Sequence, residues 1–480
     1  MKNMTLSAIA SACGGILHGE EKDGQRLVES VVTDSRKAGK DSLFIAIAGA
    51  RVDGHSFIKD VYQNGALACV SEKPLDEETT GGHPYIEVKS SLQALKDIAE
   101  FYRTQLNIKV VGITGSVGKT STKEMVAAVL SEKYKVQKTF KNLNNEVGVP
   151  LTLFSIGKEH EAAVVEMGIS DFGEMSRLGK MVKPDVMVIT NIGQSHLENL
   201  KSRDGILKAK TEVFEEMNDS SEVVLNGDDD KLSGISQVHG KKPHFFSKQD
   251  SGAEVYATDI VSRGLFGSDC ILHIGKECIK VHVPLPGEHM VLNAIGAAAV
   301  GTVLGLTPEE IAGGISKTQA VAGRGEIIRA GAYTVIDETY NANPASMRAA
   351  MDLLAMADTR KAAVIGDMFE LGEDTEALHK QTGAYCARKG IDVIICIGKL
   401  ARFMAEGARE EGEPGESAEK DGVKERTALE KGVREVYYFE DKQMCLKQLF
   451  RILKPGDAVL LKASHGMEFG KLLEAFKEKE

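Results

Sequence analysis

The chain has 480 residues, of which 42% are hydrophobic, 27% charged and 5% aromatic, and its formal net charge is −11. This length exceeds what one ordinary hydrophobic core supports, and it favours about three domains. The acidic balance excludes a general basic surface for nucleic acid, so we expect no nucleic-acid partner, and local groups such as helix N-termini and glycine loops must bind any polyphosphate.

The first residues and the cysteines indicate the compartment. The N-terminal stretch MKNMTLSAIASACGG predicts an amphipathic helix rather than a signal peptide, because Ser and Thr interrupt its short apolar part. The seven cysteines contain no CxxC pair, a pattern typical of reduced thiols. The sequence has no run of about 18 consecutive apolar residues, so we expect no membrane insertion. We therefore expect a cytoplasmic protein.

Short apolar or β-branched runs bounded by turn residues predict strands along the chain, with helical segments between them. In chain order these runs are residues 42–47, 68–70, 162–167, 186–191, 222–226, 333–337, 362–366, 393–397 and 458–462. Alternation of strand and helix favours parallel sheets covered on both faces. We expect an α/β protein with an N-terminal domain over residues 1–107, a central parallel-sheet domain over 108–324 and a C-terminal Rossmann-like domain over 325–480.

Residues 406–432 interrupt this alternation. They contain the run EEGEPGESAEKDG, which is charged and carries Gly and Pro. Such a composition cannot bury enough apolar surface to fix one conformation, and it predicts an exposed, mobile insertion.

A glycine-rich loop opens the central region, where residues 112–124 read GITGSVGKTSTKE after an apolar strand. The strict phosphate-loop pattern has Gly at the position of Ile113, so this loop is a variant of the form GxTGxxGKT. Its backbone N–H groups can still wrap a polyphosphate, with Lys119 as a point charge and Thr120 as a Mg²⁺ ligand. A chance glycine turn is the alternative. The absence of the guanine-specific NKxD signature favours ATP over GTP.

Polar residues follow the later strands of the central region. Glu166 ends one predicted strand at the carboxyl edge of the sheet, where ligands of open α/β sheets bind. Because Mg²⁺ takes hard oxygen ligands and shares them with phosphate, a carboxylate beside Thr120 is expected in phosphoryl transfer. Taken singly, Glu166 is a strand-end carboxylate, His196 a surface histidine and Lys210 a solvated lysine.

Together these motifs resemble the Mur ligases, the ATP-dependent amide-forming enzymes of peptidoglycan precursor synthesis. The resemblance extends over essentially the whole chain. It rests on GITGSVGKTS (112–121), NNE (144–146), EMG (166–168), TNIGQSHLE (190–198), AKTE (209–212), NGDDD (226–230), PGEHMVLNAIGAA (286–298) and Gly323-Arg324. It implies ATP as a substrate and Mg²⁺ as a cofactor, with two ions expected.

The resemblance implies a role for each matching residue. The implied ATP-binding residues are Thr114, Gly115, Ser116, Val117, Gly118, Lys119, Thr120, Ser121, His289, Asn293, Arg324 and Asp337. The implied metal ligands are Thr120, Glu166, His196 and Lys210, and the implied catalytic residues are Lys119, Glu166, His196 and Lys210. Lys210 matches a lysine that is carbamylated in such ligases, and a carbamate, unlike an ammonium, presents anionic oxygens to Mg²⁺.

Two C-terminal segments indicate a branch of the family. DETYNANPASMRAAM (337–351) and GDMFELGEDTEALH (366–379) resemble the branch that adds D-alanyl-D-alanine to UDP-N-acetylmuramoyl-tripeptide through an acyl phosphate. The nearest alternative is the branch that adds the third, diamino residue, whose DNPR-type signature is not found in this region. A folate-extending ligase is a further relative, and a nucleotide-dependent switch protein is the alternative from another class. We expect a monomer.

Residues 31–58 resemble the UDP-sugar-binding domain that these two branches share. The implied substrate-binding residues are Ser35, Arg36, Asp53, Gly54, His55, Asn144, Asn145, Asn341, Asn343 and Ser346. Ordinary turns at 34–36 and 53–55, and a structural Asn-Pro turn at 343–344, are the alternative explanations. The run KASHGMEFG at 462–470 stands where related enzymes often have Gly-Ser-Arg, which leaves the role of His465 open.

Overall fold

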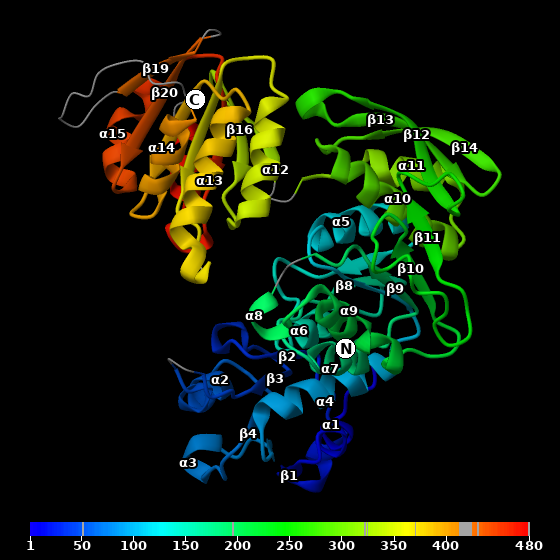
Figure 1. Ribbon diagram of the computed structural model, residues 1–480. Helices are drawn as coiled ribbons and strands as arrows, with labels where there is room; N and C mark the ends of the chain where they lie inside the picture. The colour runs from blue at the N-terminus through cyan, green and yellow to red at the C-terminus, as the bar shows by residue number, and fades with distance from the viewer. Residues whose placement is uncertain are drawn as a thin grey trace. The chain divides into compact units, whose positions relative to one another are not determined.

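The computed structural model describes residues 1–49, 52–193, 196–320, 323, 325–369, 371–411, 425–429 and 432–478. The chain divides into two compact units. The first comprises Met1–Ile260, Cys270–His282 and Val291–Thr318, and the second comprises Val261–Asp269, Val283–Met290 and Gln319–Glu480. Within the described ranges the strands form three sheets, shown in Figure 1, and helices accompany each of them. The predicted α/β class is confirmed.

The first sheet, in the order β1-β5-β4-β3-β2, is built from the N-terminal residues. β1 runs antiparallel to β5, and the other neighbours are parallel. Its strands are β1 (Ile16–His18), β2 (Ser30–Val32), β3 (Ser42–Ile45), β4 (Ala68–Ser71) and β5 (Tyr85–Glu87). Its helices are α1 (Leu6–Ala12), α2 (Ile58–Gln63), α3 (Glu77–Thr80) and α4 (Ser91–Thr104), with short 3-10 turns η1 (Glu21–Gln25), η2 (Ser35–Lys37) and η3 (Gly54–Phe57).

The second sheet has the order β14-β13-β12-β11-β10-β9-β6-β8-β7 and carries the glycine-rich loop. Its strands are β6 (Lys109–Thr114), β7 (Val136–Lys138), β8 (Ala162–Glu166), β9 (Val186–Ile189), β10 (Glu222–Asn226), β11 (His244–Ser247), β12 (Val255–Ser262), β13 (Ser268–Ile274) and β14 (Glu277–Val283). The connecting elements are α5 (Lys119–Leu130), α6 (Gly148–Phe154), α7 (Glu174–Val182), α8 (Leu197–Leu200), α9 (Arg203–Thr211), η4 (Glu212–Glu216), η5 (Gly264–Phe266), α10 (Glu288–Val303) and α11 (Pro308–Ser316). From β7 to β12 all neighbouring strands are parallel, which brings their carboxyl ends to one edge.

One hydrophobic core joins these two sheets. α4 carries buried apolar residues at helical spacing, among them Leu95 and Ile98, and they share a core cluster with Leu153 of α6 and Leu178 of α7. This shared core explains why the N-terminal and central residues form one compact unit.

The third sheet, in the order β15-β16-β21-β17-β18-β20-β19, belongs to the second unit, and its five central strands are parallel. Its strands are β15 (Glu326–Ala330), β16 (Tyr333–Glu338), β17 (Lys361–Gly366), β18 (Val393–Ile397), β19 (Glu425–Leu429), β20 (Gly432–Phe439) and β21 (Ala458–Lys462). Its helices are α12 (Pro344–Ala355), α13 (Thr375–Arg388), α14 (Ala401–Glu410), α15 (Lys442–Ile452) and α16 (Gly470–Lys477), with 3-10 turns η6 (Gly372–Asp374) and η7 (His465–Met467). Helices α12, α13 and α14 pack on one face, and α15 and α16 contribute to the core on the other (Figure 1).

One expectation about the organisation needs correction. The predicted insertion at 406–432 is wrong at both ends, because α14 continues to Glu410, and β19 lies within the predicted range and pairs antiparallel with β20. Residues 412–424, 430 and 431 lie outside the described residues. Strands β11 to β14, which widen the central sheet, were not among the predicted strands. Within the described ranges no helix is both long and apolar enough to cross a membrane.

Candidate functional site

The glycine-rich loop links β6 to α5 with backbone that only glycine accommodates well. Gly115 has φ of 151°, and a Cβ added there would lie 1.9 Å from Thr190 Oγ1. Gly118 has φ of 81°, in the left-handed region, and precedes the first residue of α5. The start of a helix presents backbone N–H groups and a partial positive charge. The loop therefore has the geometry of an anion site, as its sequence predicted.

The residues Thr190 and Asn191 hold the loop in shape from the neighbouring strand end. The Ser116 N–H donates to Asn191 O at 3.1 Å, and the Val117 N–H donates to Asn191 Oδ1 at 3.0 Å. The Thr190 hydroxyl donates to Val117 O at 2.7 Å. Thr190 and Asn191 of the TNIGQSHLE motif thus stabilise the conformation of the phosphate loop.

Other predicted ATP-binding residues lie close to the phosphate loop. Thr114 is buried at the end of β6, and its hydroxyl donates to Met167 O at 2.8 Å. Ser121 lies in the first turn of α5. Asn293, on α10, lies against the loop, because a Cβ added at Gly118 would be 3.2 Å from Asn293 Oδ1. The structure therefore brings these predicted ATP-binding residues of the first unit together.

Three polar side chains meet directly behind the loop. The Thr120 hydroxyl donates to Glu166 Oε2 at 3.0 Å, and Asn144 Nδ2 donates to Glu166 Oε1 at 2.9 Å. Glu166 ends β8 and only 2% of it is exposed, so its charge is held away from bulk water. A hydroxyl and a carboxylate are hard oxygen donors of the kind that Mg²⁺ takes. This pair fits a magnesium ion shared with a bound polyphosphate.

The other two residues of the NNE motif connect this site to the surrounding helices. Asn145 Oδ1 accepts the Gly148 N–H at 2.9 Å at the start of α6. Glu146 forms ion pairs with Lys96 of α4 at 3.3 Å and with Arg177 of α7 at 2.5 Å. The motif therefore presents one side chain, Asn144, to Glu166, while its neighbours anchor the segment. The structure gives Asn145 this capping contact, and its role in substrate binding stays a prediction.

Lys210 is buried in the last turn of α9, with only 2% of its surface exposed. Burial, and after it the charge of Lys119, together lower the pKa of Lys210 to about 7. A lysine with this pKa is substantially unprotonated at neutral pH, and only an unprotonated amine can react with carbon dioxide. The surface-lysine explanation of Lys210 is therefore wrong.

His196 occupies the turn that begins α8. Its φ is 57°, its side chain is exposed, and its carbonyl accepts the N–H groups of Asn199 at 3.2 Å and Leu200 at 3.0 Å. In the described part of the chain no three His, Cys, Asp or Glu side chains gather as a ready metal site. Of the predicted metal ligands, only Glu166 and His196 are of these residue types, which is too few for such a group of three. The role of His196 as a metal ligand therefore stays a prediction.

The Asp-Ser-Arg segment forms a 3-10 turn after β2. Asp34 caps the turn by accepting the Arg36 N–H at 3.1 Å, and the Arg36 guanidinium binds the same carboxylate at 2.9 and 2.8 Å. This guanidinium lowers the pKa of Asp34 to about 2. The Arg36 side chain is 87% exposed. Ser35 and Arg36 thus lie on an ordered turn that follows β2, and their role in substrate binding stays a prediction.

The Asp-Gly-His segment forms a second turn, η3, that folds back on the end of β3. Gly54 is required there, because a Cβ would lie 2.8 Å from both the N and the O of Ile47. Asp53 Oδ1 contacts His55 Nδ1 at 2.6 Å, while His55 Nε2 accepts the Glu72 N–H at 3.0 Å. The His55 ring therefore donates from Nδ1, and the Asp53 carboxylate orients it. Their contact with substrate stays a prediction.

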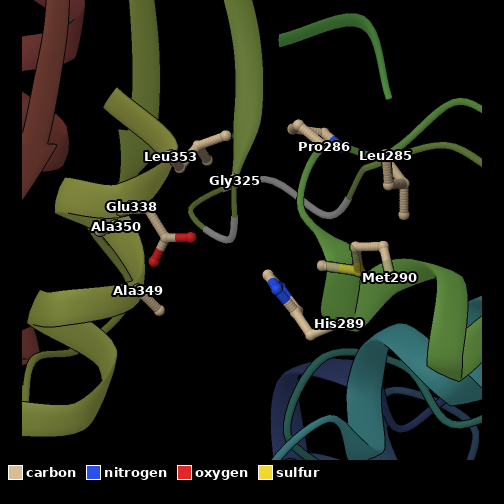
Figure 2. A pocket seen from close by; sticks show the side chains of 9 residues that line it. All are labelled: Leu285, Pro286, His289, Met290, Gly325, Glu338, Ala349, Ala350 and Leu353. Carbon is tan, nitrogen blue, oxygen red and sulfur yellow. The ribbon is translucent and has the colours of Figure 1, made fainter. Parts of the chain in front are cut away.

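The second unit contains three residues that are predicted to bind the nucleotide, namely His289, Asp337 and Arg324. His289 lines a small pocket with Leu285, Glu338 and Leu353 (Figure 2). Asp337 is buried, and its carboxylate accepts the Gly323 N–H at 2.9 Å and the Thr339 hydroxyl at 2.7 Å. Asp337 therefore fastens its own chain. Arg324 lies outside the described residues.

The residues predicted to bind the dipeptide lie between β16 and α12. Asn343 Oδ1 accepts the Ser346 N–H at 2.8 Å, and Ser346 Oγ accepts the Asn343 N–H at 3.0 Å, which makes a reciprocal capping box with Pro344 as the first helical residue. The Ser346 amide is thus taken by the cap. Asn341 Oδ1 accepts the N–H groups of Ala342 at 2.9 Å and His465 at 3.3 Å.

Sequence reasoning missed two fully buried lysines, Lys123 and Lys462. Lys462 Nζ donates to Glu338 Oε2 at 2.8 Å and to Asn341 O at 2.9 Å, which ties the KASHG run to the predicted dipeptide loop. Lys123 is three residues after Thr120, on the same side of α5. The three-residue spacing from Thr120 could have indicated Lys123 from the sequence. The contact of Lys462 could not be predicted in this way, because it depends on the pairing of β16 with β21.

Comparisons with known proteins match the whole chain. The models of the Mur ligase family catalytic domain, the Mur ligase middle domain and the Mur ligase glutamate ligase domain match residues 27–103, 113–301 and 323–465. The chain is 33% identical to the UDP-N-acetylmuramoyl-tripeptide–D-alanyl-D-alanine ligase of Bacillus subtilis (strain 168), over 99% of this chain and 98% of the relative. A crystal structure of MurF from Acinetobacter baumannii is 31% identical with a TM-score of 0.86 and 99% of both chains covered. MurF ligase from Thermotoga maritima, crystallised in complex with ADP, is 26% identical with a TM-score of 0.77, covering 94% of this chain and 97% of that one.

Proposed function

The chain belongs to the Mur ligase family, and from this premise we propose that it joins D-alanyl-D-alanine to UDP-N-acetylmuramoyl-tripeptide at the expense of ATP. One structural observation carries the proposal. The phosphate loop, the buried carboxylate of Glu166 and the buried amine of Lys210 are parts of the same unit, and the charge of Lys119 acts on Lys210. A nucleotide-dependent switch does not need a lysine with a pKa of about 7 beside its phosphate loop.

The reaction needs ATP because a carboxylate is a poor electrophile at neutral pH. The terminal carboxylate oxygen of the tripeptide attacks the γ-phosphorus of ATP, the bond to the bridging oxygen breaks, and ADP leaves. The resulting acyl phosphate has a good leaving group. The amine of D-alanyl-D-alanine then attacks the acyl carbon, the bond to the phosphate oxygen breaks, and phosphate leaves as the amine loses a proton.

The residues of the loop would act on the charge that develops during phosphoryl transfer. Lys119 supplies a positive charge at the start of α5, and the loop amides supply fixed dipoles. Thr190 and Asn191 keep these dipoles in place before substrate arrives, since both bond to the loop backbone. Removing the preorganised donors of such a site typically costs about 100-fold or more in rate.

The oxygen donors behind the loop fit Mg²⁺, and we propose that two ions are used. Thr120, Glu166 and His196 would hold the first, and a carbamate on Lys210 would help to hold the second. Bound Mg²⁺ would offset the negative charge of the polyphosphate. The low pKa of Lys210 supports the carbamate, because it leaves the amine free to take up carbon dioxide near pH 7.

The remaining residues would bind the two peptides. Ser35, Arg36 and the Asp53–His55 turn lie at the carboxyl edge of the first sheet and would bind the UDP-muramoyl substrate. Asn341, Asn343 and Ser346 would bind the dipeptide. We further propose that the chain acts as a monomer, and that it works in the cytoplasm, where these precursors are assembled.

The identity of the amine acceptor is tested by product mass. The protein is incubated with ATP, Mg²⁺ and UDP-N-acetylmuramoyl-tripeptide, and with either D-alanyl-D-alanine or a diamino acid as the amine. We expect a pentapeptide product when D-alanyl-D-alanine is the amine and no product when the diamino acid is. A product formed with the UDP-muramoyl-dipeptide and a diamino acid instead would assign the chain to the branch that adds the third residue.

A further inference from the structure

Lys123 is a buried lysine that the reaction described above does not use. Only 1% of it is exposed, and lysines are almost never buried to this degree unless they are paired. Its Nζ donates to Thr139 O at 2.8 Å and lies 3.0 Å from Glu124 Oε1 and 4.0 Å from Glu166 Oε2. A cation thus lies within reach of the proposed Mg²⁺ ligand.

The same ammonium reaches Glu166 by a second route, through the backbone. Thr139 is buried, and its hydroxyl accepts the Glu166 N–H at 2.9 Å. Because Lys123 holds the carbonyl of Thr139, it fixes the residue that fixes the main chain of Glu166. The parallel pairing of β7 with β8 sets this register, since the Thr139 N–H also donates to Val164 O at 3.0 Å.

The contacts of Glu166 leave little freedom for its carboxylate. One oxygen accepts from Thr120 and the other from Asn144. Both of these partners are neutral, and a buried carboxylate without a counter-charge is costly to maintain. Lys123 supplies the positive charge on the side of Glu166 that Thr120 also contacts.

We propose that Lys123 is a positioning residue, whose ammonium holds the Glu166 carboxylate beside Thr120 and so makes nucleotide binding responsive to Mg²⁺. This inference rests on the proposed function, because it takes Glu166 as a ligand of Mg²⁺. Loss of partners that orient metal ligands typically costs about 10- to 100-fold in metal affinity.

The chain offers a matched control in Lys138. Its side chain is 48% exposed, and it pairs with the same Glu124 that Lys123 contacts. Lys138→Met therefore removes one positive charge and one ion pair with Glu124, as Lys123→Met does, while the partners of Glu166 stay in place.

The test measures ADP binding by calorimetry with Mg²⁺ and with EDTA, and takes the ratio of the two dissociation constants. We expect the ratio to fall about 10-fold in Lys123→Met, with binding in EDTA little changed, and to stay at the wild-type value in Lys138→Met. An unchanged ratio in folded Lys123→Met would overturn the inference alone. A wild-type protein that binds ADP equally with and without Mg²⁺ would overturn the proposed metal site as well.

A double variant keeps the test decisive. In a Glu166→Gln background the added Lys123→Met should lower the ratio no further, because both residues act through one contact. A full additional loss there would contradict a role through Glu166. If Lys123→Met alone fails to fold by circular dichroism, recovery of the fold in the double variant supports the pairing, and no recovery refutes it.

Discussion

At the scale of single residues, burial gives Lys210 a chemistry that an exposed lysine lacks. Its pKa of about 7 follows first from burial and then from the charge of Lys119. Lys208, two positions earlier on the same helix, is exposed. The two lysines therefore form a natural pair for comparing a buried amine with a solvated one.

Replacing Lys210 should abolish ligation and preserve the fold. In Lys210→Ala we expect kcat to fall by about 100-fold or more, because the anionic oxygens of a carbamate are lost. A small carboxylic acid such as formate, supplied in the buffer, should restore part of the activity. Lys208→Ala should behave like the wild type. Near-normal activity of Lys210→Ala without added acid would rule out the carbamate.

The carbamate itself should depend on pH in a defined direction. Below pH 7 the Lys210 amine carries a proton and cannot react with carbon dioxide, whereas above pH 7 it is free to react. Carbon-13 spectra of protein in labelled bicarbonate should therefore show a carbamate signal that rises between pH 6 and pH 8. The signal should be missing from Lys210→Ala, and a wild-type protein without it at pH 8 would contradict the assignment.

At the scale of elements, the predicted phosphate and dipeptide residues lie at two helix starts, and each start can be perturbed separately. Those of α5 and α12 differ in how they are capped: Gly118 precedes α5, and Asn343 and Ser346 cap α12 reciprocally. The first arrangement is suited to a bound phosphate, and the second has a structural role in addition to any contact with the dipeptide.

Gly115→Ala should damage the phosphate loop. The added Cβ would overlap Thr190 Oγ1, so we expect a loss of about 2 kcal/mol of unfolding free energy together with weaker ADP binding. Gly470→Ala, at the open start of α16, should leave both quantities within about 0.5 kcal/mol of the wild type. Equal ADP affinities in the two variants would show that the close approach of loop and strand end is unimportant.

The cap of α12 allows its structural role to be separated from dipeptide binding. Asn343→Ala and Thr307→Ala each remove the cap of a capping box, in α12 and α11, and each should cost about 1 kcal/mol in stability. Steady-state kinetics should show a raised KM for D-alanyl-D-alanine in Asn343→Ala alone. Equal KM values in both variants would favour a purely structural Asn-Pro turn.

At the scale of the whole molecule, the buried parallel strands were the predictable part. The predicted strands at 393–397 and 458–462 match β18 and β21 at both ends, because short runs that are apolar throughout or up to their last residue are typical of buried parallel strands. β12 was missed, since its burial alternates and its outer residues are exposed. The family and its α/β fold, inferred from the motifs, are confirmed by the comparisons.

The candidate site divides in the same way. The phosphate loop follows from local sequence, since its glycines and its Lys-Thr pair are adjacent. The contact of Lys123 with Thr139 does not, because it depends on the order of β6, β8 and β7 in the sheet. The sequence pattern therefore predicts the phosphate loop, whereas the order of the strands determines which residues the buried charge of Lys123 contacts.

The central claim is that ATP activates a carboxylate for capture by an amine, and the stoichiometry of ADP release tests it most directly. With UDP-N-acetylmuramoyl-tripeptide and D-alanyl-D-alanine both present, one ADP should appear for each amide formed, and omission of the muramyl peptide should reduce ADP release to background. ATP cleavage at the full rate without the muramyl peptide, and with no amide formed, would contradict the account.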